Sequence, residues 1–227
     1  WIKIIHHDDW LSSPESLQDF VQATQNNPQA DFFFCQSWVF NHRINNKYFY
    51  TTPEKLTREI AHYPAALFNG NLIGAPSATM YKKSLKLEYD VQLIWLVDIE
   101  FYFRVINNYS IHYIEKPLII SGAEQEHQLT ATLVNNEKVE VEEFFYCFNK
   151  LANQLNALNI SIFRNKIIQL LNDYQIQSIS QIRATGYSGK IPIFVRLYCL
   201  MSSFHHGLSN RIINKWNYLE LKNYDHR

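Results

Sequence analysis

Two histidines and two aspartates, His6, His7, Asp8 and Asp9, directly follow an apolar run at residues 1–5. Such a run predicts a short buried strand, and ligands of open α/β sheets gather where strands end. Carboxylates there offer the oxygen ligands that Mg²⁺ or Mn²⁺ prefers, with water and substrate phosphates completing the shell. Because strand side chains alternate, we expect His6 and Asp8 on one face and His7 and Asp9 on the other. A polar loop that opens the next helix explains the same residues without a metal, and both interpretations stay open.

A second pair of acids, Asp98 and Glu100, lies in the otherwise apolar and aromatic segment WLVDIEFYFRV. If a helix begins here, Asp98 caps its first turn, and Glu100 is favoured by the positive end of the helix dipole. A carboxylate in an apolar cavity mouth also has a raised pKa, which suits a general base. The structural and the catalytic interpretation are compatible, and we keep both.

Two further segments are candidates for a ligand site. His127 lies between the acids Glu124 and Glu126 on one side and the run QLTATL on the other. An imidazole can bind a borderline metal or pair with a phosphate, although a lone histidine is more often an ordinary surface residue. The loop at 69–85, NGNLIGAPSATMYKKSL, has the glycines and proline of a turn that could close over a ligand. It contains neither the P-loop sequence nor the GxGxxG fingerprint of dinucleotide-binding folds.

The elements that must position these residues mix strands and helices up to residue 134 and are helical and amphipathic after it. We expect the first helix to have Ser13 as its N-cap and Pro14 at its first position. We therefore expect an α/β domain at 1–134 and a helical region at 135–227. The expected strands cover 1–5, 30–41, 47–50, 78–83 and 110–122, the last divided in two at Lys116 and Pro117. The expected helices before 134 begin after Ser13 and near Thr52, and a third covers 95–109.

The composition excludes several classes of protein. Lys and Arg together number 21, as do Asp and Glu, so the net charge of zero offers no basic excess for nucleic acid. Cys35, Cys147 and Cys199 are far apart and form no CxxC pair, which argues against a zinc site or a disulfide framework and favours a reducing compartment. The sequence contains neither a signal peptide nor a run of about 20 apolar residues that could span a membrane.

Taken in order, four segments resemble those of family 2 glycosyltransferases with the GT-A fold, and the resemblance covers residues 1–134. WIKIIHHDDWL resembles the strand that leads into the DXD-type motif, and NLIGAPSATMYKK resembles the loop and basic strand that follow. LVDIEFYFRV resembles the helix start that carries the catalytic acid, and EHQLT resembles the late histidine motif. The order and spacing of the four matter more than any one of them.

The resemblance implies an inverting glycosyltransferase of hexosyltransferase type. It implies a nucleotide-sugar donor and a glycan or lipid-linked acceptor, as in bacterial surface-polysaccharide synthesis. It also implies a divalent cation, Mg²⁺ or Mn²⁺, that stabilises the leaving diphosphate. A carboxylate would take the proton of the acceptor hydroxyl while that oxygen displaces the diphosphate.

The family's roles carry over residue by residue. Asp98 would be the general base, and Glu100 is the reserve candidate for that role. Asp8 would be the DXD-type acid at the ribose or metal, with Asp9 beside it at the metal and diphosphate, and His6 stands where many members have the first aspartate. The implied metal ligands are His6, Asp8, Asp9 and His127, and the implied donor-binding residues are Asp8, Asp9, Pro76 and Ser77.

In that family a mixed, Rossmann-like sheet is flanked by helices, and the strand–helix units that bind the base and ribose precede the DXD strand. The resemblance therefore implies that the chain matches the C-terminal two-thirds of the fold, with an α-helical C-terminal extension. We expect it to bind nucleotide poorly by itself. The region 135–227 could cover the sheet, form a homodimer or lie on a membrane surface. We expect a cytoplasmic protein, with peripheral contact at the inner face of the membrane left open.

Two other function classes stay open. A metal-dependent phosphohydrolase also uses adjacent His and Asp ligands, but that chemistry carries them on helices, whereas residues 1–9 read as a strand end. It would also release phosphate without an acceptor. A non-catalytic fragment that keeps the fold for protein binding would need none of the candidate side chains.

Overall fold

A computed structural model describes the chain at residues 1–50, 60–123 and 133–204. Contacts within the chain divide it into two compact units, residues 1–134 and 135–227. The division falls where the sequence pattern changes from mixed strands and helices to helices alone. Each unit is described separately.

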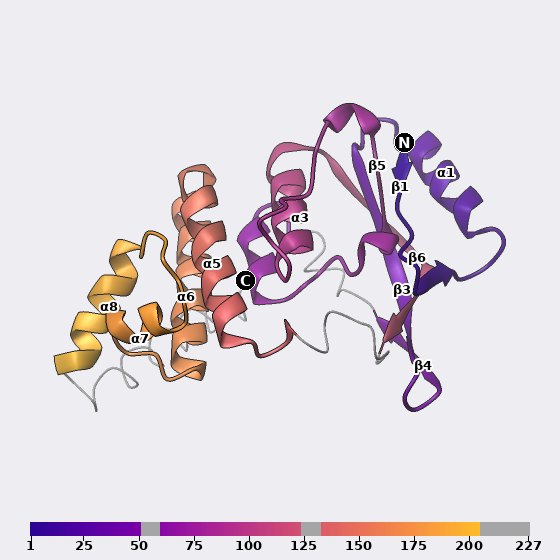
Figure 1. The fold of residues 1–227 in the computed structure, drawn as a ribbon. Coiled ribbons are helices and arrows are strands. Elements are labelled where there is room, and N and C mark those ends of the chain that lie inside the picture. The colour runs from indigo at the N-terminus through magenta and orange to yellow at the C-terminus, as the bar shows by residue number, and fades with distance from the viewer. Residues whose placement is uncertain (51–59, 124–132, 205–227) are drawn as a thin grey trace, which may run out of the picture. The chain divides into compact units, whose positions relative to one another are not determined.

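The first unit is built on a mixed sheet (Figure 1). Its order is β1-β5-β3-β6-β2, and β4 pairs with β3 beside this path. β3 and β6 run parallel, from the pair Phe32 and Ile111 to the pair Asn41 and Ala123, and the other pairings are antiparallel. The strands are β1 (Ile2–Lys3), β2 (Asp9–Leu11), β3 (Phe32–Asn41), β4 (Asn46–Tyr50), β5 (Thr79–Tyr81) and β6 (Ile111–Ala123).

Helices flank this sheet, as Figure 1 shows. Phe20 of α1 (Ser16–Asn26) packs with Phe33, Cys35 and Leu118 in the buried core. α3 (Val97–Asn108) packs on the other face of β3. The ring centroid of its Tyr102 lies 5.9 Å from that of Phe32, and Phe32 and Phe33 point to opposite faces because strand side chains alternate. The expected α/β class, a mixed sheet flanked by helices, is therefore confirmed. Short 3₁₀ turns cover Pro64–Asn69, Pro76–Ala78 and Lys83–Leu85.

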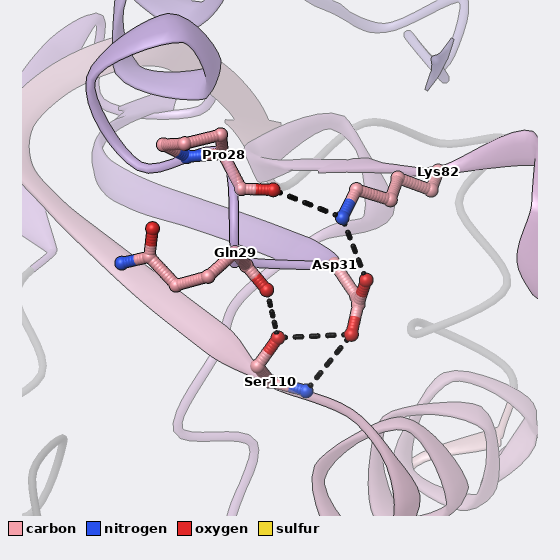
Figure 2. A network of polar contacts seen from close by, with 5 residues as sticks. All are labelled: Pro28, Gln29, Asp31, Lys82 and Ser110. Atoms are coloured by element: carbon pink, nitrogen blue, oxygen red, sulfur yellow. Dashed lines mark hydrogen bonds and ion pairs between the residues drawn. The ribbon is translucent and has the colours of Figure 1, made fainter.

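A polar network fixes one end of the three neighbouring strands β5, β3 and β6 (Figure 2). The carboxylate of Asp31, just before β3, accepts from Lys82 Nζ at 2.8 Å and from the backbone N–H of Ser110 at 3.2 Å. The Ser110 hydroxyl bridges Asp31 Oδ2 and the carbonyl of Gln29, and Lys82 Nζ also donates to the carbonyl of Pro28. Lys82 follows β5, Asp31 precedes β3 and Ser110 precedes β6. The network therefore ties the end of β5 to the starts of β3 and β6.

Two element boundaries differ from the sequence expectation. The first helix begins at Ser16 with Glu15 as N-cap, because Ser13 and Ser16 form a turn in which the Ser13 N–H donates to Ser16 Oγ at 3.0 Å. The segment 110–122 is one strand instead of two. Along β3 the paired residue changes from Ile114 to Pro117 and then to Ile119, so the register shifts on both sides of the proline. The strand continues through this irregularity. The helix expected after Thr52 lies outside the described residues.

The second unit consists of helices in its described part. Asparagine and serine side chains cap three of them, since Asn136, Asn156 and Ser178 each accept a backbone N–H three residues ahead. Phe145, Phe163 and other apolar side chains form its buried interior. The helices are α5 (Glu137–Leu151), a 3₁₀ turn (Ala152–Gln154), α6 (Ala157–Asp173), α7 (Ile179–Ala184) and α8 (Ile193–Phe204).

Among the residues that the structure describes, none of the helices combines the length and the apolar character needed to cross a bilayer.

Candidate functional site

The candidate site is a cavity of about 570 Å³ in the first unit. β1 and β2 lie at opposite edges of the sheet, so the chain between them must pass across it. This crossing segment, the loop before β5, the start of α3 and the end of β6 together form the wall. The residues that line it include His6, Asp8, Asp9, Pro76, Asp98 and Gly122.

The crossing segment is a tight turn and not a continuous strand. The Asp9 N–H donates to the His6 carbonyl at 3.1 Å, which closes the turn, and the His6 N–H donates to Ser77 Oγ at 2.8 Å. The Gly122 N–H donates to the Asp8 carbonyl at 3.1 Å. The expectation that His6 and Asp8 face away from His7 and Asp9 is therefore wrong, because strand alternation does not apply within a turn. One ligand atom from each of His6, Asp8 and Asp9 lies within 4.8 Å of the others.

Asp9 is the most enclosed member of this cluster. Its Oδ1 accepts the Gly122 N–H at 3.1 Å, whereas its buried Oδ2 has no hydrogen-bond partner among the described residues. Burial raises the pKa of the Asp9 carboxyl, the Ser77 hydroxyl opposes this rise, and the neighbouring Asp8 carboxylate adds to it. A buried carboxylate oxygen without a partner is costly unless a ligand satisfies it.

The side chains present fit a divalent cation. Two carboxylates and an imidazole form a donor set that suits Mn²⁺, and Mg²⁺ also takes one or two carboxylates with water and phosphate completing its shell. One carboxylate oxygen of Asp9 lies within 4.8 Å of a ligand atom of His6 and of Asp8. His6, Asp8 and Asp9 are therefore the residues that could hold the ion.

Asp98 lies across the same cavity, in the first turn of α3. Burial raises its pKa to about 6, and the nearby His6 opposes that rise. The first turn presents backbone N–H groups without helical partners, which favour a negative charge there. Asp98 thus combines a position at the helix start with a carboxyl group that ionises near neutral pH.

Glu100 is not part of the cavity wall. It is fully buried and forms a two-pronged ion pair with Arg104, with its oxygens 2.8 Å from Nε and 2.9 Å from Nη2. Two residues along a helix turn the side chain by about 200°, so Glu100 points away from the direction of Asp98. The structure gives Glu100 a structural role and does not place it as a reserve base.

The two donor-binding candidates on the loop before β5 differ in access. Pro76 lines the cavity, but Ser77 is fully buried. The Ser77 hydroxyl accepts the His6 N–H, and its carbonyl accepts from Lys3 Nζ, a group whose pKa burial lowers to about 8. Ser77 therefore holds the turn that carries His6 and is not itself exposed to a ligand.

Three of the cavity residues that were not among the predicted site residues are Tyr89, Ser121 and Gly122. Ser121 and Gly122 lie near the end of β6, which is the edge where parallel strands present ligand sites. The hydroxyl of Tyr89 is buried without a hydrogen-bond partner among the described residues, while its ring stacks on Phe101 with centroids 4.3 Å apart. A strand ending in Ser-Gly was a usable signal for the first two, whereas nothing in the sequence singles out Tyr89. His127, the fourth implied metal ligand, lies outside the described residues.

Comparison with known proteins gives no further identification, since no protein-family model matches the chain and a search of curated proteins also finds no match.

Proposed function

We propose that this chain carries the metal–diphosphate and proton-acceptor residues of an inverting glycosyltransferase with a GT-A-like fold. The observation that carries the proposal is that the His6, Asp8 and Asp9 cluster and the Asp98 carboxyl line one cavity. The four residues come from two segments about 90 positions apart in the chain, and they are the residues to which the family resemblance assigns these roles.

The proposed donor is a nucleotide-sugar, and the acceptor is the hydroxyl group of a glycan or a lipid-linked sugar. Asp98, with a pKa raised to about 6, is ionised near neutral pH and still basic enough to accept the proton of the attacking hydroxyl. The acceptor oxygen bonds to the anomeric carbon as the bond from that carbon to the diphosphate oxygen breaks, which inverts the configuration. A divalent cation held by His6, Asp8 and Asp9 would supply positive charge for the departing nucleoside diphosphate.

The other side chains of the cavity prepare this step. Ser77 and Gly122 hold the turn that presents the acidic cluster. The His6 N–H donates to Ser77 Oγ, and the Gly122 N–H donates to Asp9 Oδ1. Tyr89 also lines the cavity, and its hydroxyl is buried without a hydrogen-bond partner among the described residues. A mixed sheet with a site at the carboxyl end of its parallel pair supports the GT-A-like assignment.

The experiment is a transfer assay on the full-length protein with Mn²⁺, a panel of nucleotide-sugars and sugar acceptors. We expect donor consumption that depends on the acceptor and a product of inverted anomeric configuration. Asp9→Ala should lower transfer at least about 100-fold, because it removes the enclosed ligand of the cluster. Asp173→Ala is the matched control, because Asp173 is an exposed aspartate at the end of α6 in the other unit. This variant should transfer sugar at the wild-type rate.

Retention of the anomeric configuration would contradict the single displacement. Release of inorganic phosphate without an acceptor would favour the phosphohydrolase alternative. Absence of any turnover, in a protein shown to be folded, would favour a non-catalytic domain that binds other proteins.

A further inference from the structure

Helix α8 has one face that is fully used in packing. Val195 and Cys199 are buried, and the Tyr198 hydroxyl donates to Asn172 Oδ1 of α6 at 2.7 Å. The Phe194 ring lies 5.0 Å from the ring of Phe148 on α5. These contacts fix which side of α8 faces its own unit.

The opposite face of α8 is apolar and exposed. Ile193, Leu197, Leu200 and Met201 are 73%, 54%, 57% and 54% exposed. Their spacing of three and four residues places them on a single stripe of the helix. Single exposed apolar side chains need no explanation, but a continuous stripe of four indicates a surface that is covered by something else.

The charged residues of the segment 175–204 all have one sign. Residues 175–204 contain Arg183, Lys190 and Arg196 and no aspartate or glutamate. Arg196 lies on α8 between the exposed Ile193 and Leu197, and it lines a cavity of about 360 Å³ together with Arg183 of α7. We call this region the α7–α8 surface; it consists of Ile179, Arg183, Lys190, Ile193, Arg196, Leu197, Leu200 and Met201.

The main chain holds both guanidinium groups in place. Arg183 Nη1 donates to the carbonyls of Tyr187 and Gly189 at 2.8 and 2.9 Å, and Arg196 Nε donates to the carbonyl of Ile191 at 3.3 Å. A guanidinium has five N–H donors, so these bonds leave others for a further acceptor. The cavity therefore offers two oriented cations beside the apolar side chains of Ile179 and Leu200.

We infer that the α7–α8 surface binds an anionic phospholipid membrane, with the apolar stripe of α8 among the acyl chains and Arg183 and Arg196 at lipid phosphates. Apolar side chains on one face of a helix and cations beside them are the pattern of a helix that lies in the interface. The described part of α8 has 12 residues, fewer than a bilayer span needs, and in this proposal it lies in the membrane plane.

The charge pattern favours a membrane over a second copy of the chain. A two-fold dimer through this surface would place Arg183, Lys190 and Arg196 of both copies in one interface, to which the segment 175–204 brings no acidic residue. Like charges that meet in an interface oppose association, whereas an anionic leaflet attracts all three residues.

The test is flotation of the full chain with lipid vesicles. We expect it to float with phosphatidylcholine vesicles enriched in phosphatidylglycerol and to stay unbound with phosphatidylcholine alone. Arg183→Gln with Arg196→Gln should weaken binding by about tenfold or more, because each cation near an anionic surface contributes a several-fold factor. Leu197→Glu with Leu200→Glu should abolish flotation by removing the apolar anchor.

Leu158→Glu is the matched control, since Leu158 is a 43% exposed leucine on α6 of the same unit, outside the surface; it should float like the wild type. Added salt should reduce wild-type binding, a readout that needs no variant and is therefore independent of folding defects. Equal binding to both vesicle types, no binding to either, or a dimer in solution that Leu197→Glu dissociates would overturn the inference. Flotation requires no sugar transfer, so its failure would leave the proposed function untouched.

Discussion

At the scale of single residues, the site depends on two carboxylates whose surroundings raise their pKa values. Burial does so for Asp9 and for Asp98, which reaches about 6. The sequence was sufficient to predict a raised pKa for Asp98, because an acid at the start of an aromatic helix lies in an apolar environment. It could not separate Asp98 from Glu100, since only the packing of α3 shows that Arg104 neutralises Glu100 away from the cavity. The sequence pattern also led to a wrong prediction of the faces of residues 6–9, because these residues form a turn and the alternation of side chains holds only in a strand.

The raised pKa of Asp98 predicts how stability varies with pH. A carboxyl with a pKa of about 6 in the folded state and about 4 in the unfolded state binds its proton more tightly when folded. Its contribution is therefore most favourable below about pH 4 and is lost as the pH rises through 6. Asp98→Asn removes this loss. The variant should be more stable than wild type at about pH 8, on the order of 1–2 kcal/mol for a side chain that is partly exposed, and the difference should disappear near pH 4.

Urea unfolding of wild type and variant at both pH values measures this difference. The exposed Asp173→Asn is the matched control and should follow wild type throughout. A variant whose stability advantage over wild type is the same at both pH values would show that Asp98 is not the group responsible.

At the scale of elements, local sequence patterns predicted most segments and missed how some of them end. β3 coincides with the aromatic run at 32–41, and α3 with the segment predicted from 95 to 109. The start of α1 was shifted by the bond between the Ser13 N–H and Ser16 Oγ, which competes with the expected cap. β6 stays continuous because its parallel partner β3 resumes pairing after the register shifts at Pro117. Both departures result from hydrogen bonds or strand pairing with other residues, which the intrinsic helix or strand propensity of a segment does not show.

The Asp31 network predicts a pH dependence of the opposite sign. The hydrogen bond from Lys82, with those from Ser110, lowers the pKa of Asp31. Its contribution to stability is therefore present above the unfolded pKa of about 4 and is lost as the pH falls through the lower folded value. Asp31→Asn should lower the free energy of unfolding by about 1 kcal/mol at neutral pH and by less in acid, since the pair is partly exposed but belongs to a network.

Asp19→Asn provides the comparison, because it breaks the more exposed and isolated ion pair with Lys116. Its cost should be only a few tenths of a kcal/mol. Thermal or urea unfolding of both variants measures the difference. An equal cost for Asp19→Asn and Asp31→Asn would mean that the network in Figure 2 adds nothing beyond a single surface pair.

At the scale of the whole molecule, the chain consists of two units with different tasks in this account. The first unit, 1–134, holds the cavity, and the second, 135–227, holds the α7–α8 surface. The change in sequence pattern near 134 could be read directly, because helical periodicity is a local property. The cavity could not be derived in this way, since the bond between Asp9 and Gly122 joins residues 113 positions apart and depends on the order of the strands.

The most direct test of the central claim is the rate of sugar transfer by Asp98→Asn in the full-length protein. If Asp98 accepts the acceptor proton, the variant should lose about 10²- to 10⁴-fold in kcat while Mn²⁺ binding is unchanged. The wild-type rate should rise with pH through about 6 as this carboxyl ionises. Glu100→Gln, assayed at a temperature where it is folded, should stay within about tenfold of wild type, because it does not line the cavity. A transfer rate of Asp98→Asn equal to that of wild type would contradict the account.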